Sequence, residues 1–187
     1  MSRRSEQKQQ RQQELVSLLE ENPFLTDEEA AQYFGVSPQT IRLDRLELKI
    51  PEMRKRSQDM ARQAYRELKA LSGREIVGEL YELELGKRAL SLLETTSEMV
   101  FEKSRVVRGH YIYAQAESLA IALVDAEVAL IGVANIKYKH PVYVGDRLVA
   151  QAQVTRQRGN KYFIWVRTWC RDKEVFRAKF ILVSLSQ

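Results

Sequence analysis

The order of hydrophobic and polar positions changes character along the chain. Up to about residue 70 the apolar residues recur at helical spacing, as where Leu15, Leu18 and Leu19 share one stripe. After about residue 85 the order becomes that of strands, and between 147 and 155 apolar and polar residues alternate strictly. The first pattern predicts amphipathic helices, and the second predicts strands with one buried face.

The N-terminal helices carry clear start and stop signals. Thr26 is a candidate N-cap before three acidic residues, and Gly35 ends that helix after about two turns. Ser37 caps the next helix, and Pro38 takes its first position, where a missing N–H costs nothing. A short helix, a glycine turn and a second helix predict a helix-turn-helix.

The second helix of this pair carries side chains suited to reading DNA. We expect Ile41 and Leu46 to pack inward, leaving Gln39, Thr40, Arg42 and Arg45 to point outward. Arginine pairs with guanine and glutamine with adenine, while the hydroxyls of Ser37 and Thr40 suit phosphates. The alternative is a three-helix protein-interaction module with a solvated basic face.

Charge is distributed as DNA binding requires. Residues 12–35 hold six acidic and no basic side chains, whereas residues 36–69 hold nine Lys or Arg against five Asp or Glu. The cluster Arg54, Lys55 and Arg56 adds positive charge just after the predicted reading helix. We expect this cluster to contact phosphates.

A run of strong helix formers follows, from Pro51 to about Ser72. Its apolar stripe (Met53, Met60, Ala64, Leu68 and Leu71) suits packing on a partner helix or on the rest of the chain. We therefore predict three parts: a DNA-binding domain at 1–50, an amphipathic linker helix at 51–72, and a domain at 73–187.

The pattern in residues 73–187 predicts strands around one helix. The segments 147–155, 160–170 and 174–185 are strand-like and separated by turn signals, while 110–124 is an apolar helix with almost no charge. A mostly antiparallel sheet wrapped around that helix is the economical reading, so the fold class is α+β. Arg108 and Gly109 precede the helix, where an arginine fork and free N–H groups can grip a carboxylate or phosphate. Arg108 could equally pair with a surface acid.

Composition limits the remaining choices. Of 187 residues, 44% are hydrophobic, which is enough for a real core, and the net charge of +5 permits nucleic-acid binding. Cys170 is alone, so no intrachain disulfide is expected, and His110 and His140 are too far apart in sequence to suggest a metal site. No apolar run is long enough for a membrane span or a signal peptide, so we expect a cytoplasmic protein.

Two long motifs carry a family resemblance. The segment "HPVYVGDRLVAQAQV" after an apolar helix resembles the hot-dog fold of acyl-CoA thioesterases. Together with "NPFLTDEEAAQYFGVSPQTIRLDRLELKIPEMRKR" and "VFEKSRVVRGHYIYAQAESLA", it makes the whole chain resemble the FapR family, bacterial repressors of fatty-acid and phospholipid synthesis genes. The resemblance implies a winged-helix (DeoR-like) helix-turn-helix, a linker helix and a homodimeric hot-dog domain. It implies malonyl-CoA or malonyl-acyl carrier protein as the effector. We expect a dimer that binds a palindromic operator when the pocket is empty and is released by the effector, with no cofactor.

The resemblance also assigns an effector site. Arg108 would pair with the malonyl carboxylate, Gly109 would lie beside it, and Phe101 would line the pocket. Glu117 stands where the family's asparagine is expected, so it could repel the carboxylate, turn away, or pair with Arg108.

Enzyme activity is not expected, and no catalytic residue is assigned. Glu117 nevertheless keeps one alternative open, a hot-dog thioesterase using this carboxylate as base or nucleophile. A third reading is an acyl-CoA sensor that acts only through protein partners.

Overall fold

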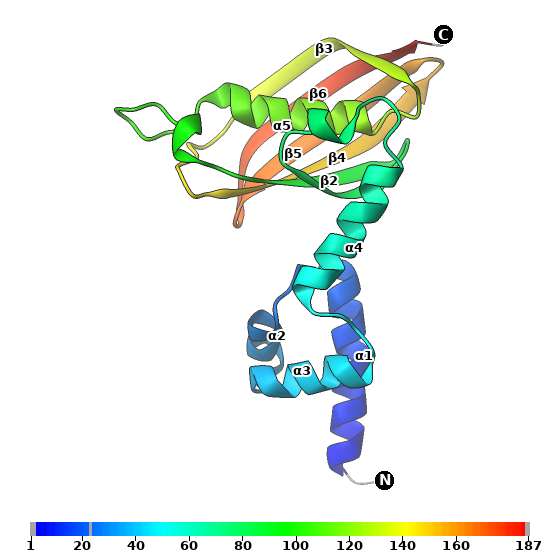
Figure 1. Ribbon diagram of the computed structural model, residues 1–187, viewed down its shortest axis with the longest axis vertical. Coiled ribbons are helices and arrows are strands. Elements are labelled where there is room, and N and C mark those ends of the chain that lie inside the picture. The colour runs from blue at the N-terminus through cyan, green and yellow to red at the C-terminus, as the bar shows by residue number, and fades with distance from the viewer. Residues whose placement is uncertain (1–2, 23, 186–187) are drawn as a thin grey trace. The chain divides into compact units, whose positions relative to one another are not determined.

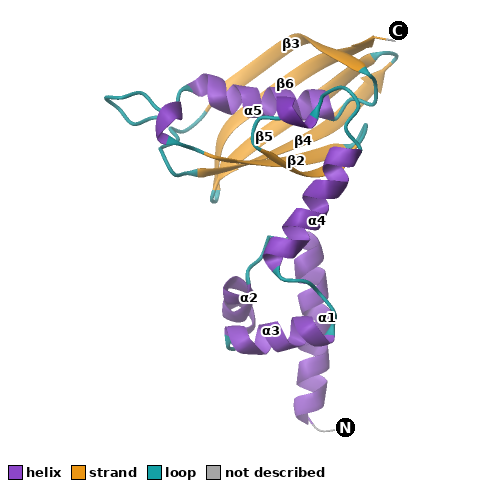
Figure 2. Cartoon of the chain, viewed as in Figure 1, coloured by secondary structure: helices purple, strands orange, loops and turns teal. Residues whose placement is uncertain are grey.

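The computed structural model describes residues 3–22 and 24–185, with side chains from Glu6 onward. The chain divides into two compact units, and the division falls between Met60 and Ala61. Figures 1 and 2 show the helices and strands of each unit. Each unit has its own hydrophobic core. The predicted domain limits of 1–50, 51–72 and 73–187 stay predictions.

The first unit is built from helices, and its caps follow the sequence signals. Helices α1 (Arg3–Glu21), α2 (Asp27–Phe34) and α3 (Pro38–Glu47) surround a core of Leu15, Leu19, Ala30, Ala31 and Ile41. Thr26 forms a capping box with Glu29, and Gly35 ends α2 in the left-handed conformation at φ 63°. Ser37 caps α3 by accepting a hydrogen bond from the Thr40 N–H. The helix-turn-helix is therefore confirmed.

No strand occurs in residues 3–22 and 24–78, so this described part of the chain has no β-wing. Residues 49–52 instead lead directly into helix α4 (Met53–Arg66). The prediction that this helix continues to Ser72 is wrong for its last six residues. Leu68 and Leu71 leave the helix to pack on the core of the second unit, and burial of these side chains outweighs their helix propensity.

The second unit is one antiparallel sheet on a central helix. After a 3₁₀ turn (Gly73–Glu75), its elements are β1 (Glu79–Glu84), β2 (Arg88–Glu94), a 3₁₀ turn (Ser97–Met99), α5 (Gly109–Ala122), β3 (Val128–Tyr138), β4 (Arg147–Arg158), β5 (Lys161–Cys170) and β6 (Lys173–Leu185). The strand order is β1-β2-β4-β5-β6-β3. Figure 1 shows α5 lying along one face of this sheet.

The alternation read from the sequence is confirmed in β4, where Leu148, Ala150 and Ala152 are buried. They face α5, whose Ile112, Ala116 and Leu119 are also buried, and the two sets form one core. β3 is the edge strand beyond β6, and most of its length is exposed. No helix in the described part of the chain is long and apolar enough to cross a bilayer.

Candidate functional site

The outward face of α3 is the candidate DNA-reading surface. Gln39 and Arg42 are exposed, as predicted, and Thr40 is partly exposed. The hydroxyls of Ser37 and Thr40 lie 2.9 Å apart at the start of α3. An exposed arginine and glutamine at the N-terminal half of a second helix match the geometry that places base-reading side chains in the major groove.

The prediction that Leu46 packs inward and Arg45 points outward is wrong for both side chains. Arg45 is only 5% exposed, whereas Leu46 is 62% exposed. The inward stripe of α3 begins at Ile41 and continues through Asp44 and Arg45, the positions three and four residues later. Leu46 therefore shares the outward face with Arg42 and Leu43.

Arg45 forms its hydrogen bonds within the protein instead of pointing outward. Its Nε and Nη2 donate to the two carboxylate oxygens of Asp27 at 2.6 and 2.8 Å, and its Nη1 donates to the Ile50 carbonyl at 3.0 Å. The hydrogen bonds with Asp27 raise the pKa of Arg45. On the same side of α3, Asp44 accepts from Arg11 of α1 at 2.7 Å. These bonds fix α3 against α2 and α1.

The basic cluster Arg54, Lys55 and Arg56 also contains both exposed and partly buried side chains. Arg54 and Lys55 are exposed at the start of α4. Arg56 is partly buried and donates to the carbonyls of Leu25, at 2.8 Å, and Pro51. Burial lowers the pKa of Arg56. Arg54 and Lys55 thus remain suited to phosphate contact, while Arg56 stabilises the unit.

Arg108 is the N-cap of α5 and lies beside the 3₁₀ turn before it. Its Nη2 donates to the Glu98 carbonyl and to the Tyr111 hydroxyl at 3.1 Å, and its guanidinium lies 5.1 Å from the Tyr111 ring centre. Its Nε is buried without a hydrogen-bond partner in the described residues. Among those residues Arg108 also forms no ion pair with an acid. The guanidinium is oriented but not neutralised.

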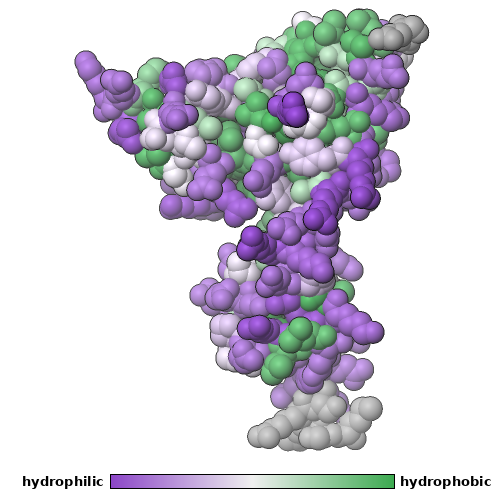
Figure 3. Space-filling model, in the orientation of Figure 1, coloured by the Kyte–Doolittle hydropathy of each residue, from purple (hydrophilic) through white to green (hydrophobic). Residues whose placement is uncertain are grey.

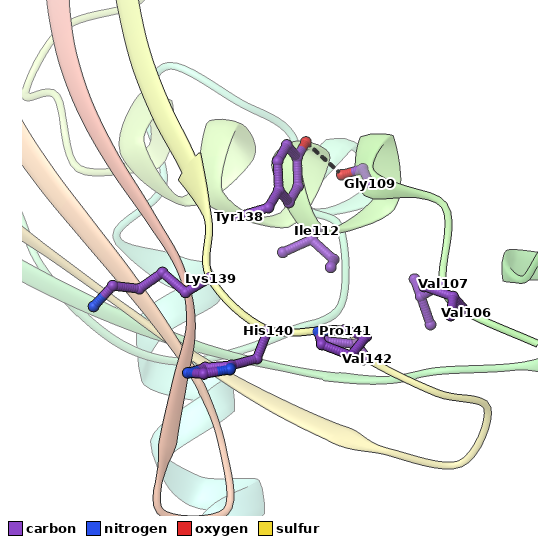
Figure 4. Close-up of a pocket in the computed structure, with 9 residues that line it drawn as sticks. All are labelled: Val106, Val107, Gly109, Ile112, Tyr138, Lys139, His140, Pro141 and Val142. Atoms are coloured by element: carbon purple, nitrogen blue, oxygen red, sulfur yellow. Dashed lines mark hydrogen bonds between the residues drawn. The ribbon is translucent and has the colours of Figure 1, made fainter.

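Gly109 lines a pocket of about 410 Å³, together with Val106, Val107, Ile112, Tyr138, Lys139, His140, Pro141 and Val142. Figure 4 shows the Tyr138 hydroxyl facing the Gly109 carbonyl, while Lys139 extends away from both. Of the four predicted effector residues, only Gly109 is among the lining residues described here. The lining is mostly apolar, so the pocket suits an uncharged ligand portion.

The other two predicted effector residues lie apart from this pocket. Phe101 is 54% exposed on the hairpin that joins Val100 to Val107. Glu117 is partly exposed and accepts a hydrogen bond from Tyr113 at 3.3 Å. It follows Arg108 by nine residues, which is about 13 Å along a helix. Glu117 is therefore oriented by Tyr113 and not by Arg108.

Sequence reasoning missed Asp27 and Tyr138. Asp27 was read as one of three acids in a helix first turn, and nothing local marks it as the partner of Arg45. Tyr138 lies in a segment to which the sequence analysis assigned no element. The period-two pattern of β3 places it on the α5 side of the sheet, which was the one available signal.

Two family models match the chain, one in each unit. A DeoR-like helix-turn-helix domain matches residues 11–56, and a thioesterase superfamily domain matches residues 106–176. The helix-turn-helix and the hot-dog fold are thus supported independently of the geometry. Among solved structures, an uncharacterised protein from Pyrococcus horikoshii is 29% identical, with a TM-score of 0.58 over 62% of this chain and 88% of its own. The PaaI protein of Escherichia coli shares the fold, with a TM-score of 0.54 at 17% identity over 58% of this chain and 79% of its own.

Curated relatives match almost the whole chain. "Transcription factor FapR" of Caldanaerobacter subterraneus subsp. tengcongensis is 61% identical over 96% of this chain and 90% of its own length. The protein of that name in Bacillus subtilis is 44% identical over 92% of this chain and 94% of its own. These relatives carry the name of transcription factors and not of enzymes. The chain therefore belongs to the FapR family of transcription factors.

Proposed function

We propose that this transcription factor represses fatty-acid and phospholipid biosynthesis genes in the cytoplasm and is released from its operator by malonyl-CoA or malonyl-acyl carrier protein. The observation that carries the effector assignment is Arg108. Its guanidinium has no acidic partner among the described residues, and its buried Nε is unsatisfied. A buried donor without a partner is costly, so an incoming carboxylate would be strongly favoured there.

The same geometry explains why the effector would be a malonyl and not an acetyl thioester. The two groups differ by one carboxylate, and the first N–H groups of α5 next to Arg108 favour negative charge. A ligand without the carboxylate leaves the Nε donor unpaired. Such a site discriminates strongly between the two thioesters, because a ligand without the carboxylate leaves a buried polar group of the protein without a hydrogen-bond partner.

The apolar pocket beside Gly109 supports the same proposal. Its volume of about 410 Å³ is suited to part of a drug-sized ligand, and its apolar wall would contact a thioester arm. In this arrangement Arg108 binds the charged end of the effector and the pocket binds an uncharged portion. Phe101 and Glu117 stay predicted effector residues.

Repression requires a dimer on a palindromic operator, since each chain offers a single reading helix. Strand β3 supports the dimer. It is an unpaired edge, and Leu130 and Val133 on it are 56% and 51% exposed. In Figure 3 hydrophobic atoms gather along the upper edge of the second unit, where β3 runs. A long apolar edge of this kind is normally covered, here by a second copy of the chain.

Release follows if malonyl-CoA binds more tightly to a form of the dimer that does not hold the operator. The test is a gel shift with DNA from upstream of the protein's own gene, titrated with several CoA thioesters. Malonyl-CoA should abolish the shift and acetyl-CoA should leave it intact. A shift that both thioesters abolish equally, or that neither affects, would contradict the proposal.

A further inference from the structure

The contact between Tyr138 and Gly109 joins the end of β3 to the start of α5. The Tyr138 hydroxyl donates to the Gly109 carbonyl at 2.9 Å (Figure 4). A Cβ atom on Gly109 would lie 2.9 Å from Tyr138 Cζ and 3.0 Å from Cε1 and Oη. Any side chain at this position would collide with the tyrosine ring. Gly109 is not among the glycines with positive φ, so space and not backbone conformation requires glycine here.

The ring has limited freedom to move away from such a collision. Tyr138 pairs with Phe176 across the β3–β6 ladder, and the two ring centres lie 5.0 Å apart. Phe176 is completely buried in the core. Burial also raises the pKa of Tyr138, so its phenol stays protonated and remains a donor at neutral pH. The ring is thus held by the core on one side and by the Gly109 carbonyl on the other.

Arg108 directly precedes Gly109, so whatever fixes Gly109 also fixes the guanidinium. We propose that Tyr138 is a positioning residue for effector recognition: by gripping Gly109 it holds Arg108 at the geometry that binds the effector carboxylate. The inference rests on the proposed function of Arg108. It also explains why a glycine follows this arginine. A larger side chain would collide with the Tyr138 ring, whereas the alternative explanation is that the glycine leaves room for the ligand.

Paired substitutions distinguish whether Gly109 is required by the Tyr138 ring or by the approach of the ligand. Gly109→Ala should raise the malonyl-CoA concentration needed for operator release by at least about tenfold, because overpacking displaces the start of α5. Adding Tyr138→Val should return the response to that of Tyr138→Val alone, since the ring that the new Cβ meets is gone. If the glycine serves ligand approach instead, the double variant stays as insensitive as Gly109→Ala alone.

Tyr143→Val is the matched control. Tyr143 is 48% exposed, close to the 49% of Tyr138, and does not line the pocket. Combined with Gly109→Ala it should restore nothing. Tyr138→Phe keeps the ring and removes only the hydrogen bond, so it should weaken the response by about threefold.

Fluorescence anisotropy of labelled operator, titrated with malonyl-CoA, measures each variant, and calorimetry measures malonyl-CoA binding directly. Operator affinity without effector should be the same in all variants, because the reading helix lies in the other unit; thermal unfolding and subunit mass verify the fold. This inference alone is overturned if wild type responds but Gly109→Ala with Tyr138→Val responds no better than Gly109→Ala alone, or if Tyr138→Phe responds like wild type. A wild type that neither binds nor responds to malonyl-CoA overturns the proposed function and this inference together.

Discussion

Arg42 and Arg45 lie on α3 within one turn of each other, yet their surroundings differ completely. Arg42 is exposed, while Arg45 is enclosed by Asp27 and the Ile50 carbonyl. An arginine on a reading helix is easily taken for a base contact. Here the bidentate geometry with Asp27 assigns Arg45 to the packing of α3 on α2.

Substitution should separate the two roles. Arg45→Ala leaves a carboxylate that is 24% exposed without its partner, which should lower the stability of the first unit by about 2 kcal/mol. Arg42→Ala should change stability by less than about 0.5 kcal/mol and weaken operator binding by roughly 1–3 kcal/mol. Thermal unfolding at 222 nm and operator anisotropy measure the two effects. Equal stability of the two variants would contradict this assignment.

Glu174 gives the second unit a pH dependence. Its hydrogen bonds with Arg177, at 2.8 Å, and Lys139, at 3.1 Å, lower its pKa below the ordinary value of 4.5. A carboxylate with a lowered folded-state pKa stabilises the protein above its unfolded-state pKa, and that contribution disappears as the pH falls. Wild type should thus lose more stability than Glu174→Gln between about pH 5 and pH 3. Urea unfolding midpoints at pH 7 and pH 3 make the comparison, and parallel losses would contradict it.

Periodicity predicted the helices of the first unit, α5 and strands β4, β5 and β6, whereas no segment was predicted for β1, β2 or β3. The β4 alternation and the apolar α5 follow from local order alone, because burial of one strand face imposes period two. The end of α4 and the inward face of α3 were not predictable in this way. Leu68 and Arg45 are placed by partners distant in sequence, and Asp27 lies 18 residues from Arg45.

At the level of secondary-structure elements, the exposed strand β3 gives a testable prediction. Leu130→Lys with Val133→Lys should convert the proposed dimer into a monomer, because charged side chains at an open edge oppose strand pairing. Both positions are more than half exposed in the single chain, so the hot-dog fold should persist. Light scattering coupled to size exclusion should then report one 21.8 kDa chain. A dimer that survives with unchanged mass would locate the interface elsewhere.

At the scale of the whole molecule, the sequence indicated DNA binding and the proposed effector binding more clearly than it indicated the residues that would perform them. Helix caps and charge indicated DNA binding, and the arginine before an apolar helix indicated an anion site. The hydrogen bond from Tyr138 to Gly109 spans 29 residues, so no local pattern predicts it. Long-range contacts of this kind decide how Arg108 is oriented, and therefore how an effector would be recognised.

The surroundings of Glu117 bear on whether the whole molecule acts as a regulator or as a thioesterase. A hot-dog thioesterase needs a carboxylate within hydrogen-bond range of the thioester or its attacking water, whereas Glu117 is bound by Tyr113. Incubation with acyl-CoA thioesters should release no free thiol, measured with a thiol reagent. Thiol release that Glu117→Ala abolishes would establish the enzyme instead.

The most direct test follows one operator complex as malonyl-CoA is added, with wild type and Arg108→Ala measured side by side by fluorescence anisotropy. Arg108→Ala should bind the operator as tightly as wild type before any thioester is added. Wild type should then leave the DNA as malonyl-CoA rises, while Arg108→Ala stays bound. Release of Arg108→Ala at the same malonyl-CoA concentrations as wild type would contradict the proposal that this guanidinium recognises the effector.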